Sequence, residues 1–383
     1  MTTMPGNIKS KIDKFKSLEF GTSGLRDKVT AMTDMECYIN TRGFIMFLEE
    51  RGDIDSLNKD IALSGDLRSS TPRIMSSVSV AIKDSGYSTL FCGRVPTPTL
   101  ACYAMGRRIP GIMVTGSHIP DDRNGIKFTK KSGEVLKTDE DDILRNVKHA
   151  RTTEYKKSPQ ESLFDAKGMF KKEYNLPDAE CETEAINIYA NRYSDIFQGK
   201  PLAHKKIVLY QHSAVGGDIV QNIFEGIGAD VIPIERSDKF IAVDTEKVSI
   251  DTAALLQKTS REHKPFAIIT TDGDSDRPLL ADENGSFLPG DKLGALVSMF
   301  LNPDYVAIPI SANDAVVSSL GKRGINVIQT RIGSPYIIDA MNSEIERNPG
   351  SKVAGWECNG GFLIGSDWTI NDSFLRSLPT RDA

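Results

Sequence analysis

Short apolar runs alternate with amphipathic stretches along most of the chain. Runs rich in β-branched and aromatic residues predict strands, and the stretch 71–86, where Ile74, Val78 and Ile82 recur every four residues, predicts a helix. In this part of the chain the predicted strands are 61–65, 88–93 and 111–116, and the predicted helices are 71–86 and 97–108. This βαβαβ order with short connections is typical of a layered α/β domain.

The same pattern returns twice after a break. Residues 150–180 are polar and charged without sustained apolar periodicity, and they predict a linker in which some helix can form. Further strands are predicted at 205–210, 229–234, 266–270, 305–310, 325–330 and 352–357. Further helices are predicted at 216–228, at 313–322 and after Ser334. We therefore expect three α/β domains, with boundaries at 1–165, 166–288 and 289–383.

Composition narrows the class of protein. The chain has 383 residues, and its 47 basic and 52 acidic residues give a formal charge of −5, which argues against nucleic acid or an anionic membrane as the main partner. No apolar run approaches the roughly 20 residues that a membrane helix needs, and the first residues lack the apolar stretch of a signal peptide. Five scattered cysteines without a CxxC pair favour neither disulfides nor zinc, so we expect a cytoplasmic protein. The sequence indicates no oligomeric state.

The segment TTDGDSDRP (270–278) places three carboxylates, Asp272, Asp274 and Asp276, directly after a predicted strand. Carboxylates this close repel one another, and a divalent cation with a preference for oxygen ligands, such as Mg²⁺ or Ca²⁺, relieves that repulsion. A calcium loop of the EF-hand type would find Glu283 at its twelfth position but Arg277 where glycine belongs at the sixth. A catalytic Mg²⁺ loop is the main interpretation, and a solvated acidic turn is the remaining alternative.

The segment GIMVTGSHIPD (111–121) delivers Ser117 and His118 where a predicted strand ends. A polar turn, a nucleophile beside a base, and a phosphate acceptor are all compatible with this pair, although the G-x-S-x-G elbow of acyl-transfer enzymes is absent. Asn124-Gly125-Ile126-Lys127 follows closely and brings a cation within reach. A phosphoserine would carry about −1.5 to −2 charges and would be stabilised by a divalent cation and a lysine.

Two further segments are weaker signals. In FGTSGLRD (20–27), two glycines flank Thr-Ser, so backbone N–H groups can approach an anion that Arg26 can bind as a fork. In GWECNGGFL (355–363), a strand presents Glu357 and Asn359 on one side, and a carboxylate with an amide suits two neighbouring sugar hydroxyls. Each of these segments alone is also typical of an ordinary polar turn or strand end.

In this order and spacing, the four segments resemble the α-D-phosphohexomutase superfamily, the phosphomannomutases and phosphoglucomutases, over residues 18–383. SGDLRSSTPR (64–73) and TRIGSPY (330–336) are smaller matches. The resemblance implies three tandem α/β domains with mixed sheets around a shared active-site cleft. It also implies reversible phosphoryl transfer between C1 and C6 of a hexose phosphate, through a phosphoserine and a hexose 1,6-bisphosphate, with Mg²⁺ as cofactor and mannose slightly favoured over glucose.

The resemblance assigns roles to individual residues. Lys127 is implied as the general acid/base, with His118 assisting or holding the loop, and Arg277 either contacts substrate, orients the metal loop or pairs with its own aspartates. The catalytic residues implied are Ser117, Lys127, His118 and Arg26; those implied in substrate binding are Glu357, Asn359, Arg277, Gly333 and Ser334; and those implied at the metal are Ser117, Asp272, Asp274 and Asp276.

The chain departs from the family pattern at three places. Ile119 stands where asparagine usually follows the Ser-His pair, and Gly361 stands where the sugar loop commonly has histidine, although an asparagine-glycine-glycine subgroup exists. The fourth, C-terminal domain with its Arg-x-Ser-Gly-Thr phosphate loop is absent, and LPTRDA falls at the helix that closes the third domain in relatives. We therefore expect a truncated chain or a natural short form, with weak turnover by this chain alone. The alternatives are a non-catalytic sugar-phosphate-binding protein derived from a mutase and a metal-dependent phosphatase.

Overall fold

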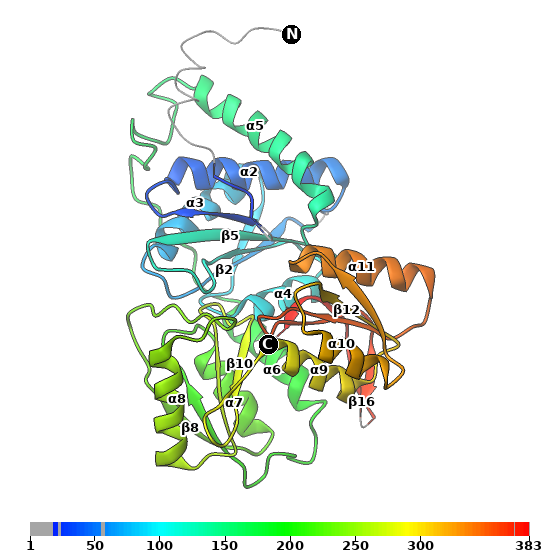
Figure 1. Cartoon of the computed structure of the whole chain (residues 1–383). Coiled ribbons are helices and arrows are strands. Elements are labelled where there is room, and N and C mark those ends of the chain that lie inside the picture. Colours follow the sequence, from blue (N-terminus) through cyan, green and yellow to red (C-terminus); the bar gives the residue numbers. More distant parts are fainter. Residues whose placement is uncertain (1–17, 22–23, 55–57, 371, 383) are drawn as a thin grey trace.

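The structure is a computed structural model that describes residues 18–21, 24–54, 58–370 and 372–382. Three α/β units follow one another along the chain, each built on its own sheet (Figure 1). Each sheet contains both parallel and antiparallel pairs of strands. The predicted class, three α/β domains with mixed sheets, is therefore confirmed.

The first sheet has the order β1-β5-β4-β2-β3, with β6 paired to β5. Strand β2 is parallel to β3 and β4, and β5 is antiparallel to β1 and β4. The strands are β1 (Gly24–Lys28), β2 (Asp60–Gly65), β3 (Ser88–Phe91), β4 (Gly111–Val114), β5 (Arg123–Lys130) and β6 (Gly133–Glu134). The helices are α2 (Asp34–Arg51), α3 (Thr71–Asp84), α4 (Thr97–Gly106) and α5 (Glu140–Lys156), with a 3₁₀ turn at Lys137–Asp139.

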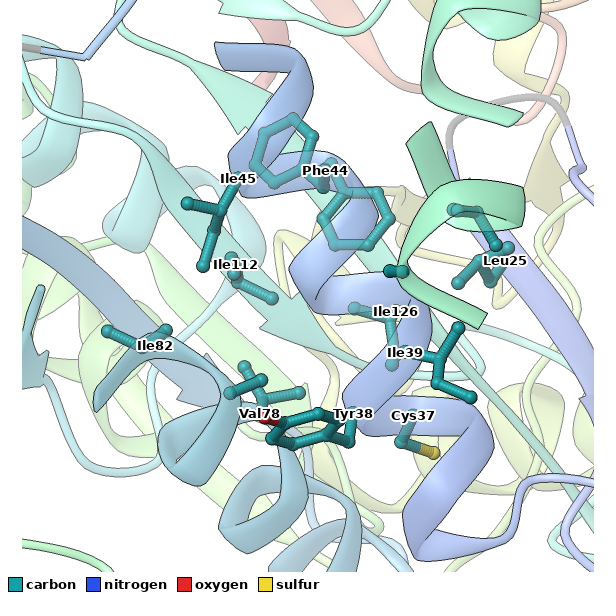
Figure 2. Packing of buried hydrophobic residues seen from close by; sticks show 14 of the residues in the cluster. Leu25, Cys37, Tyr38, Ile39, Phe44, Ile45, Val78, Ile82, Ile112 and Ile126 are labelled. Carbon is teal, nitrogen blue, oxygen red and sulfur yellow. The ribbon is translucent and has the colours of Figure 1, made fainter. Parts of the chain in front are cut away.

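Helix α2 forms the centre of the first core, between α3, α5 and the sheet (Figure 2). Phe44 stacks on Phe128 of β5 with ring centroids 4.3 Å apart, and the Thr33 side chain caps the helix by accepting from the Glu36 N–H. The hydrophobic pattern did not predict α2, because a helix that is buried on nearly all sides has no polar stripe to reveal its period.

Residues 157–180, expected to be part of a polar linker, lie instead on the first unit. Phe164 is buried in the first core, and Phe170 stacks on it at 5.0 Å. The backbone N–H of Phe170 donates to Asp34 Oδ2 in α2. Isolated aromatic residues attach this segment, so it shows no sequence periodicity even though it is packed.

The second sheet has the order β11-β10-β9-β7-β8, with β7 parallel to β8 and β9, and β10 antiparallel to β9. Its strands are β7 (Lys206–Tyr210), β8 (Asp230–Ile234), β9 (Ala267–Thr271), β10 (Pro278–Ala281) and β11 (Phe287–Leu288), and its helices are α6 (Glu182–Ser194), α7 (Gly217–Gly226) and α8 (Ile250–His263). Tyr189 of α6 and Ile223 of α7 share a core cluster with Leu100 and Tyr103 of α4. This shared core fixes the second unit against the first.

The third sheet has the order β13-β12-β14-β15-β18, and a hairpin of β16 and β17 stands beside it. Its strands are β12 (Tyr305–Pro309), β13 (Asn326–Thr330), β14 (Val353–Trp356), β15 (Phe362–Ile364), β16 (Trp368–Ile370), β17 (Ser373–Leu375) and β18 (Leu378–Asp382), and its helices are α9 (Gly290–Leu301), α10 (Asp314–Gly321) and α11 (Ser334–Arg347). Residues 378–382, which the resemblance places at a helix of the relatives, form β18, antiparallel to β15. Proline is poorly suited to a helix interior but is tolerated on an edge strand such as β18.

An apolar groove of about 590 Å³ lies between the second and third units. Its walls come from α6, α7, α9, β10 and β15, and Leu296 and Phe300 of α9 on its rim are 54% and 61% exposed. It contains almost no polar surface, so it offers no chemistry of its own. Within the described ranges, none of the helices is long and apolar enough to cross a membrane.

Candidate active site

Loops from all three sheets meet in one buried polar cluster. Ser117 lies in the loop after β4, the three aspartates lie in the loop between β9 and β10, and Glu357 follows β14. All three loops leave the carboxyl ends of their strands, which is where α/β sheets place ligand sites. Arg26 and Lys127 come from the adjacent antiparallel strands β1 and β5.

The backbone of Ser117 is held in the left-handed region, at φ +55°. Non-glycine residues adopt this region at some cost, and they persist in it where the surroundings determine them. The Ser117 N–H donates to Thr115 Oγ1 at 2.8 Å, and the Ser117 hydroxyl donates to Asp272 Oδ2 at 2.5 Å. The strained turn thus points the hydroxyl at the acidic loop of the second unit.

Arg68 binds the backbone of the loop that carries Ser117. No role for Arg68 was predicted from the sequence. Its guanidinium donates to the carbonyl oxygens of Ser117 at 2.8 Å and Ile119 at 2.5 Å, and its Nε donates to Asp66 Oδ2 at 3.1 Å. A β-carbon at Gly116 would lie 2.6 Å from the Arg68 guanidinium carbon, so any side chain there would displace the guanidinium. Ile119 replaces the asparagine that is usual at this position. The loop is nevertheless bound to Arg68, because the bond involves the backbone carbonyl oxygen of Ile119.

The three aspartates are buried, with Asp272 and Asp274 fully covered and Asp276 1% exposed. One oxygen from each lies within 4.8 Å of the other two. Neither Asp274 Oδ1 nor Asp276 Oδ1 accepts a hydrogen bond from any described residue. This burial contradicts the solvated acidic turn. Glu283 is exposed beyond β10 and outside the cluster, so the EF-hand alternative is not supported either.

Lys127 balances the acidic loop. Its Nζ lies 2.6 Å from Asp274 Oδ2 and 2.7 Å from Asp276 Oδ2. Burial lowers the pKa of Lys127, but Asp274 and Asp276 outweigh that effect and raise it, so the ammonium is charged at neutral pH. Burial raises the pKa of Asp274, but Lys127 together with the Thr97 hydroxyl lowers it below its ordinary value. Burial and the two neighbouring carboxylates raise the pKa of Asp272 well above its ordinary value.

His118 lies between the serine and Arg277. Its Nδ1 accepts from Arg277 Nη1 at 2.8 Å and is 3.4 Å from Ser117 Oγ. Burial, with Arg277 and Arg26, lowers the pKa of His118 to about 4, so the imidazole is neutral at neutral pH. Arg277 Nε is also 3.9 Å from Asp272 and 3.7 Å from Asp276, so one of the alternatives for Arg277, pairing with its own aspartates, is present in the structure.

Arg26 projects from β1 toward the same cluster. Burial lowers its pKa, and so do the nearby cations Arg277 and Arg381, while Asp274 raises it. Thr22 and Ser23 of the GTSGLR segment lie outside the described residues. The expected anion-binding turn at this segment therefore stays a prediction, and only the position of Arg26 supports it.

The sugar loop joins the cluster through Glu357 and Asn359, which are both buried. Asn359 Oδ1 accepts from the Gly361 N–H at 3.0 Å, and the Asn359 carbonyl oxygen accepts from Thr245 of the second unit at 2.7 Å. Glu357 Oε2 is 3.0 Å from Nε of Arg381, a residue that no motif singled out. No local pattern signals Arg381, because its partners are distant in sequence.

Ser334 and Gly333 lie at the start of α11, behind the sugar loop. The Ser334 hydroxyl donates to Glu134 Oε2 at 2.7 Å and accepts from Arg381 Nη2 at 3.2 Å. Gly333 has a φ of +123°, which favours glycine. The structure thus brings Ser334 to the cluster through Arg381, in a fully buried position.

Comparison with known proteins gives a consistent result. The family descriptions phosphoglucomutase/phosphomannomutase α/β/α domains I, II and III match residues 17–154, 188–285 and 289–380. A phosphomannomutase of Salmonella muenchen is 39% identical over 366 residues, which cover 96% of this chain and 70% of that protein. A phosphomannomutase of Sinorhizobium fredii is 36% identical over 95% of this chain and 73% of its own length.

Solved structures agree on the fold. The crystal structure of a putative phosphomannomutase from Thermus thermophilus has a TM-score of 0.72 at 18% identity, covering 96% of this chain and 77% of that chain. A phosphoglucomutase/phosphomannomutase family protein from Burkholderia thailandensis has a TM-score of 0.68 at 17% identity, covering 94% of this chain and 74% of that chain.

Proposed function

The chain belongs to the phosphoglucomutase/phosphomannomutase family and is a phosphohexomutase, and we propose that it moves a phosphoryl group between C1 and C6 of mannose through phosphorylated Ser117. Two relatives above 35% identity are named phosphomannomutases, which supports mannose phosphate over glucose phosphate as the substrate. The contact that carries the proposal is Ser117 Oγ to Asp272 Oδ2 at 2.5 Å, because it places a hydroxyl nucleophile against an acidic metal site.

The charges of the cluster support phosphorylation of Ser117. Four carboxylates face four cations: Asp272, Asp274, Asp276 and Glu357 against Arg26, Lys127, Arg277 and Arg381. With every carboxylate counted as ionised, including Asp272 with its raised pKa, the formal charges cancel, four against four. A phosphoserine adds about −1.5 to −2 charges, and a divalent cation adds two positive charges. Phosphorylation together with binding of a divalent cation therefore leaves the net charge of the site nearly unchanged.

The residues present fit Mg²⁺. Asp274 Oδ1 and Asp276 Oδ1 are buried acceptors without a described hydrogen-bond donor, and all the oxygens of the cluster are the hard ligands that Mg²⁺ prefers. Asp272, Asp274 and Asp276 would hold the ion together with a phosphoserine oxygen. Bound Mg²⁺ would supply charge neutralisation to the transferred phosphoryl group.

The transfer itself balances without a further reactant. A sugar hydroxyl oxygen forms a bond to phosphorus and the bond between phosphorus and Ser117 Oγ breaks, while His118 accepts the hydroxyl proton and Lys127 donates a proton to Ser117 Oγ. Lys127 starts charged and His118 starts neutral, so one can donate a proton while the other accepts one. The return transfer at the other hydroxyl reverses these steps and restores both protonation states.

Glu357 and Asn359 would bind sugar hydroxyls while the intermediate turns over, and Arg26 and Arg277 would bind its phosphates. Residues that only bind the substrate matter in this reaction, because phosphoryl transfer depends mainly on the position of the substrate and on neutralisation of the phosphoryl charge.

Peptide mapping by mass spectrometry tests the proposal. The chain is incubated with mannose 1,6-bisphosphate and Mg²⁺, and we expect one phosphoryl group on Ser117. Ser117→Ala is the control for the site of modification. Ser69→Ala, at an exposed serine that donates to Asp121, is the control for non-specific transfer. An unmodified Ser117 in a folded, Mg²⁺-loaded protein contradicts the proposal, and a phosphoryl group found only as free phosphate would favour the phosphatase.

A further inference from the structure

Arg381 contacts both the acidic loop and the sugar loop. Among the described residues, no other arginine of the cluster does so. Its Nη1 lies 3.3 Å from Asp276 Oδ2 in the second unit, and its Nε lies 3.0 Å from Glu357 Oε2 in the third. Its Nη2 donates to Ser334 Oγ at 3.2 Å. The side chain is 4% exposed, so these contacts are made away from bulk water.

The fold places Arg381 by pairing β18 with β15. Phe362 is the register partner of Asp382, and Gly361 and Arg381 are the residues that directly precede these two. A β-carbon on Gly361 would lie 2.8 Å from Cδ and 2.9 Å from Cγ of Arg381. The arginine stem therefore fills the space that any side chain at position 361 would need. The glycine that departs from the family pattern and the arginine that no motif predicts fit together.

The two carboxylates depend on this cation. Asp276 is 1% exposed and Glu357 is 7% exposed, and a buried carboxylate that loses its partner is strongly destabilised. The two contacts are ion pairs at 3.3 and 3.0 Å that do not have hydrogen-bond geometry. Arginine suits this position because its planar group spreads one positive charge over nitrogens that face two carboxylates, whereas lysine presents a single charged nitrogen. A neighbouring residue connects the first unit as well, since Thr380 Oγ1 donates to Glu134 Oε1 at 2.7 Å.

We propose that Arg381 is a positioning residue that couples metal binding at Asp276 to sugar-phosphate binding at Glu357. This inference rests on the proposed function, because it takes the acidic loop as the Mg²⁺ site and the sugar loop as the hydroxyl site. When a cation binds Asp276, the Arg381–Asp276 contact weakens and the guanidinium is available to Glu357 and the sugar phosphate. Binding at either site then favours binding at the other by the same factor.

Arg381→Lys is the decisive variant, because it keeps the charge. The direct attraction between the metal ion and the substrate phosphate is the same in both proteins, so any lost coupling reflects the geometry of the guanidinium. Arg376→Lys is the matched control, since Arg376 is exposed in the same C-terminal segment. Gly361→Ala is a second, independent variant, and its β-carbon would displace the Arg381 stem.

Isothermal titration calorimetry measures the affinity for mannose 1-phosphate with and without Mg²⁺, and the affinity for Mg²⁺ alone. We expect Mg²⁺ to tighten sugar-phosphate binding at least about fivefold in the unchanged chain and in Arg376→Lys. In Arg381→Lys and Gly361→Ala, we expect this factor to fall at least threefold. We expect Arg381→Lys to fold because the charge is kept, and circular dichroism tests this. If that variant unfolds, the result for Gly361→Ala decides.

The outcomes separate the two proposals. If the unchanged chain binds neither Mg²⁺ nor mannose 1-phosphate, the proposed function fails. If it binds both but the coupling factor is unchanged in Arg381→Lys and Gly361→Ala, or is absent in the unchanged chain, the function stands and the role of Arg381 is overturned.

Discussion

Ser117 and Asp272 are 155 positions apart in the sequence, yet the hydroxyl of one donates to the carboxylate of the other at 2.5 Å. The contact crosses from the first unit to the second, and Asp274 makes a second crossing by accepting from Thr97 at 2.5 Å. The serine and the acidic loop therefore form one site only when the two units are assembled, and the core shared by α4, α6 and α7 provides that assembly.

Mg²⁺ should stabilise the chain, and Asp274→Asn should remove that effect. A ligand that binds only the folded state raises the free energy of unfolding by about 2.7 kcal/mol at one hundred times its Kd. Thermal melts with Mg²⁺ and with a chelator measure this difference. Asp314→Asn, at an exposed position on α10, should keep the Mg²⁺-dependent shift. The same shift in Asp274→Asn would show that Mg²⁺ binds elsewhere.

Lys127→Met should strengthen metal binding while abolishing phosphoryl transfer. The ammonium lies within 2.7 Å of carboxylate oxygens on both Asp274 and Asp276, so it competes with a cation for them. Removing one buried positive charge should raise the affinity for Mn²⁺ or Mg²⁺ about tenfold. Calorimetry measures the affinity, and Lys28→Met, an exposed lysine on β1, is the control. Weaker metal binding in Lys127→Met would mean that the lysine orients the carboxylates instead of competing.

Arg68→Met should destabilise the first unit strongly. The change leaves Asp66 without its buried cation and several loop carbonyls without a donor, and breaking such a pair costs about 3–5 kcal/mol. Unfolding in urea can be followed by circular dichroism, while fluorescence of the chain's two tryptophans, Trp356 and Trp368, reports the third unit. The tryptophan transition should shift less than the circular dichroism transition.

The control for Arg68→Met is Arg236→Met, since Arg236 is exposed and pairs with exposed Asp218 at the surface. We expect that change to alter the free energy of unfolding by less than about 1 kcal/mol. A loss below about 1 kcal/mol for Arg68→Met as well would show that the serine loop keeps its conformation without this side chain.

Sequence patterns predicted the parts of the site that follow strands. The strands before Ser117, before Asp272 and before Glu357 are apolar runs that end in polar turns, and each appears in the structure as β4, β9 or β14. The resemblance added the roles of these residues, which remain proposals. This works because strand ends and the loops after them are local features of the chain.

The hydrophobic pattern and the motifs did not predict features that depend on tertiary contacts. Helix α2 has no polar stripe, and the segment around Phe164 has packed aromatics without a period. Arg68 and Arg381 make their contacts with residues far away in sequence, so only the assembled fold shows what they do. The strand β18 likewise depends on its partner β15, and the resemblance suggested a helix there instead.

Stability of the first unit should fall as pH rises toward 7, because of Glu36. Burial raises the pKa of Glu36 to about 7, although Arg151 Nη2 is only 2.7 Å from its carboxylate and opposes the shift. The folded state then binds more protons than the unfolded state between about pH 4.5 and 7. The contribution is fully present below pH 4.5 and is lost as pH rises through 7, which amounts to about 3 kcal/mol over the window.

Glu36→Gln should remove this dependence, because the amide stays neutral and its oxygen can still accept from Arg151. Urea unfolding of both proteins at pH 5, 6, 7 and 8 gives the difference curve for the circular dichroism transition, with the tryptophan transition of the third unit as internal reference. A difference curve that is flat, or that rises with pH, would show that Arg151 keeps Glu36 ionised throughout.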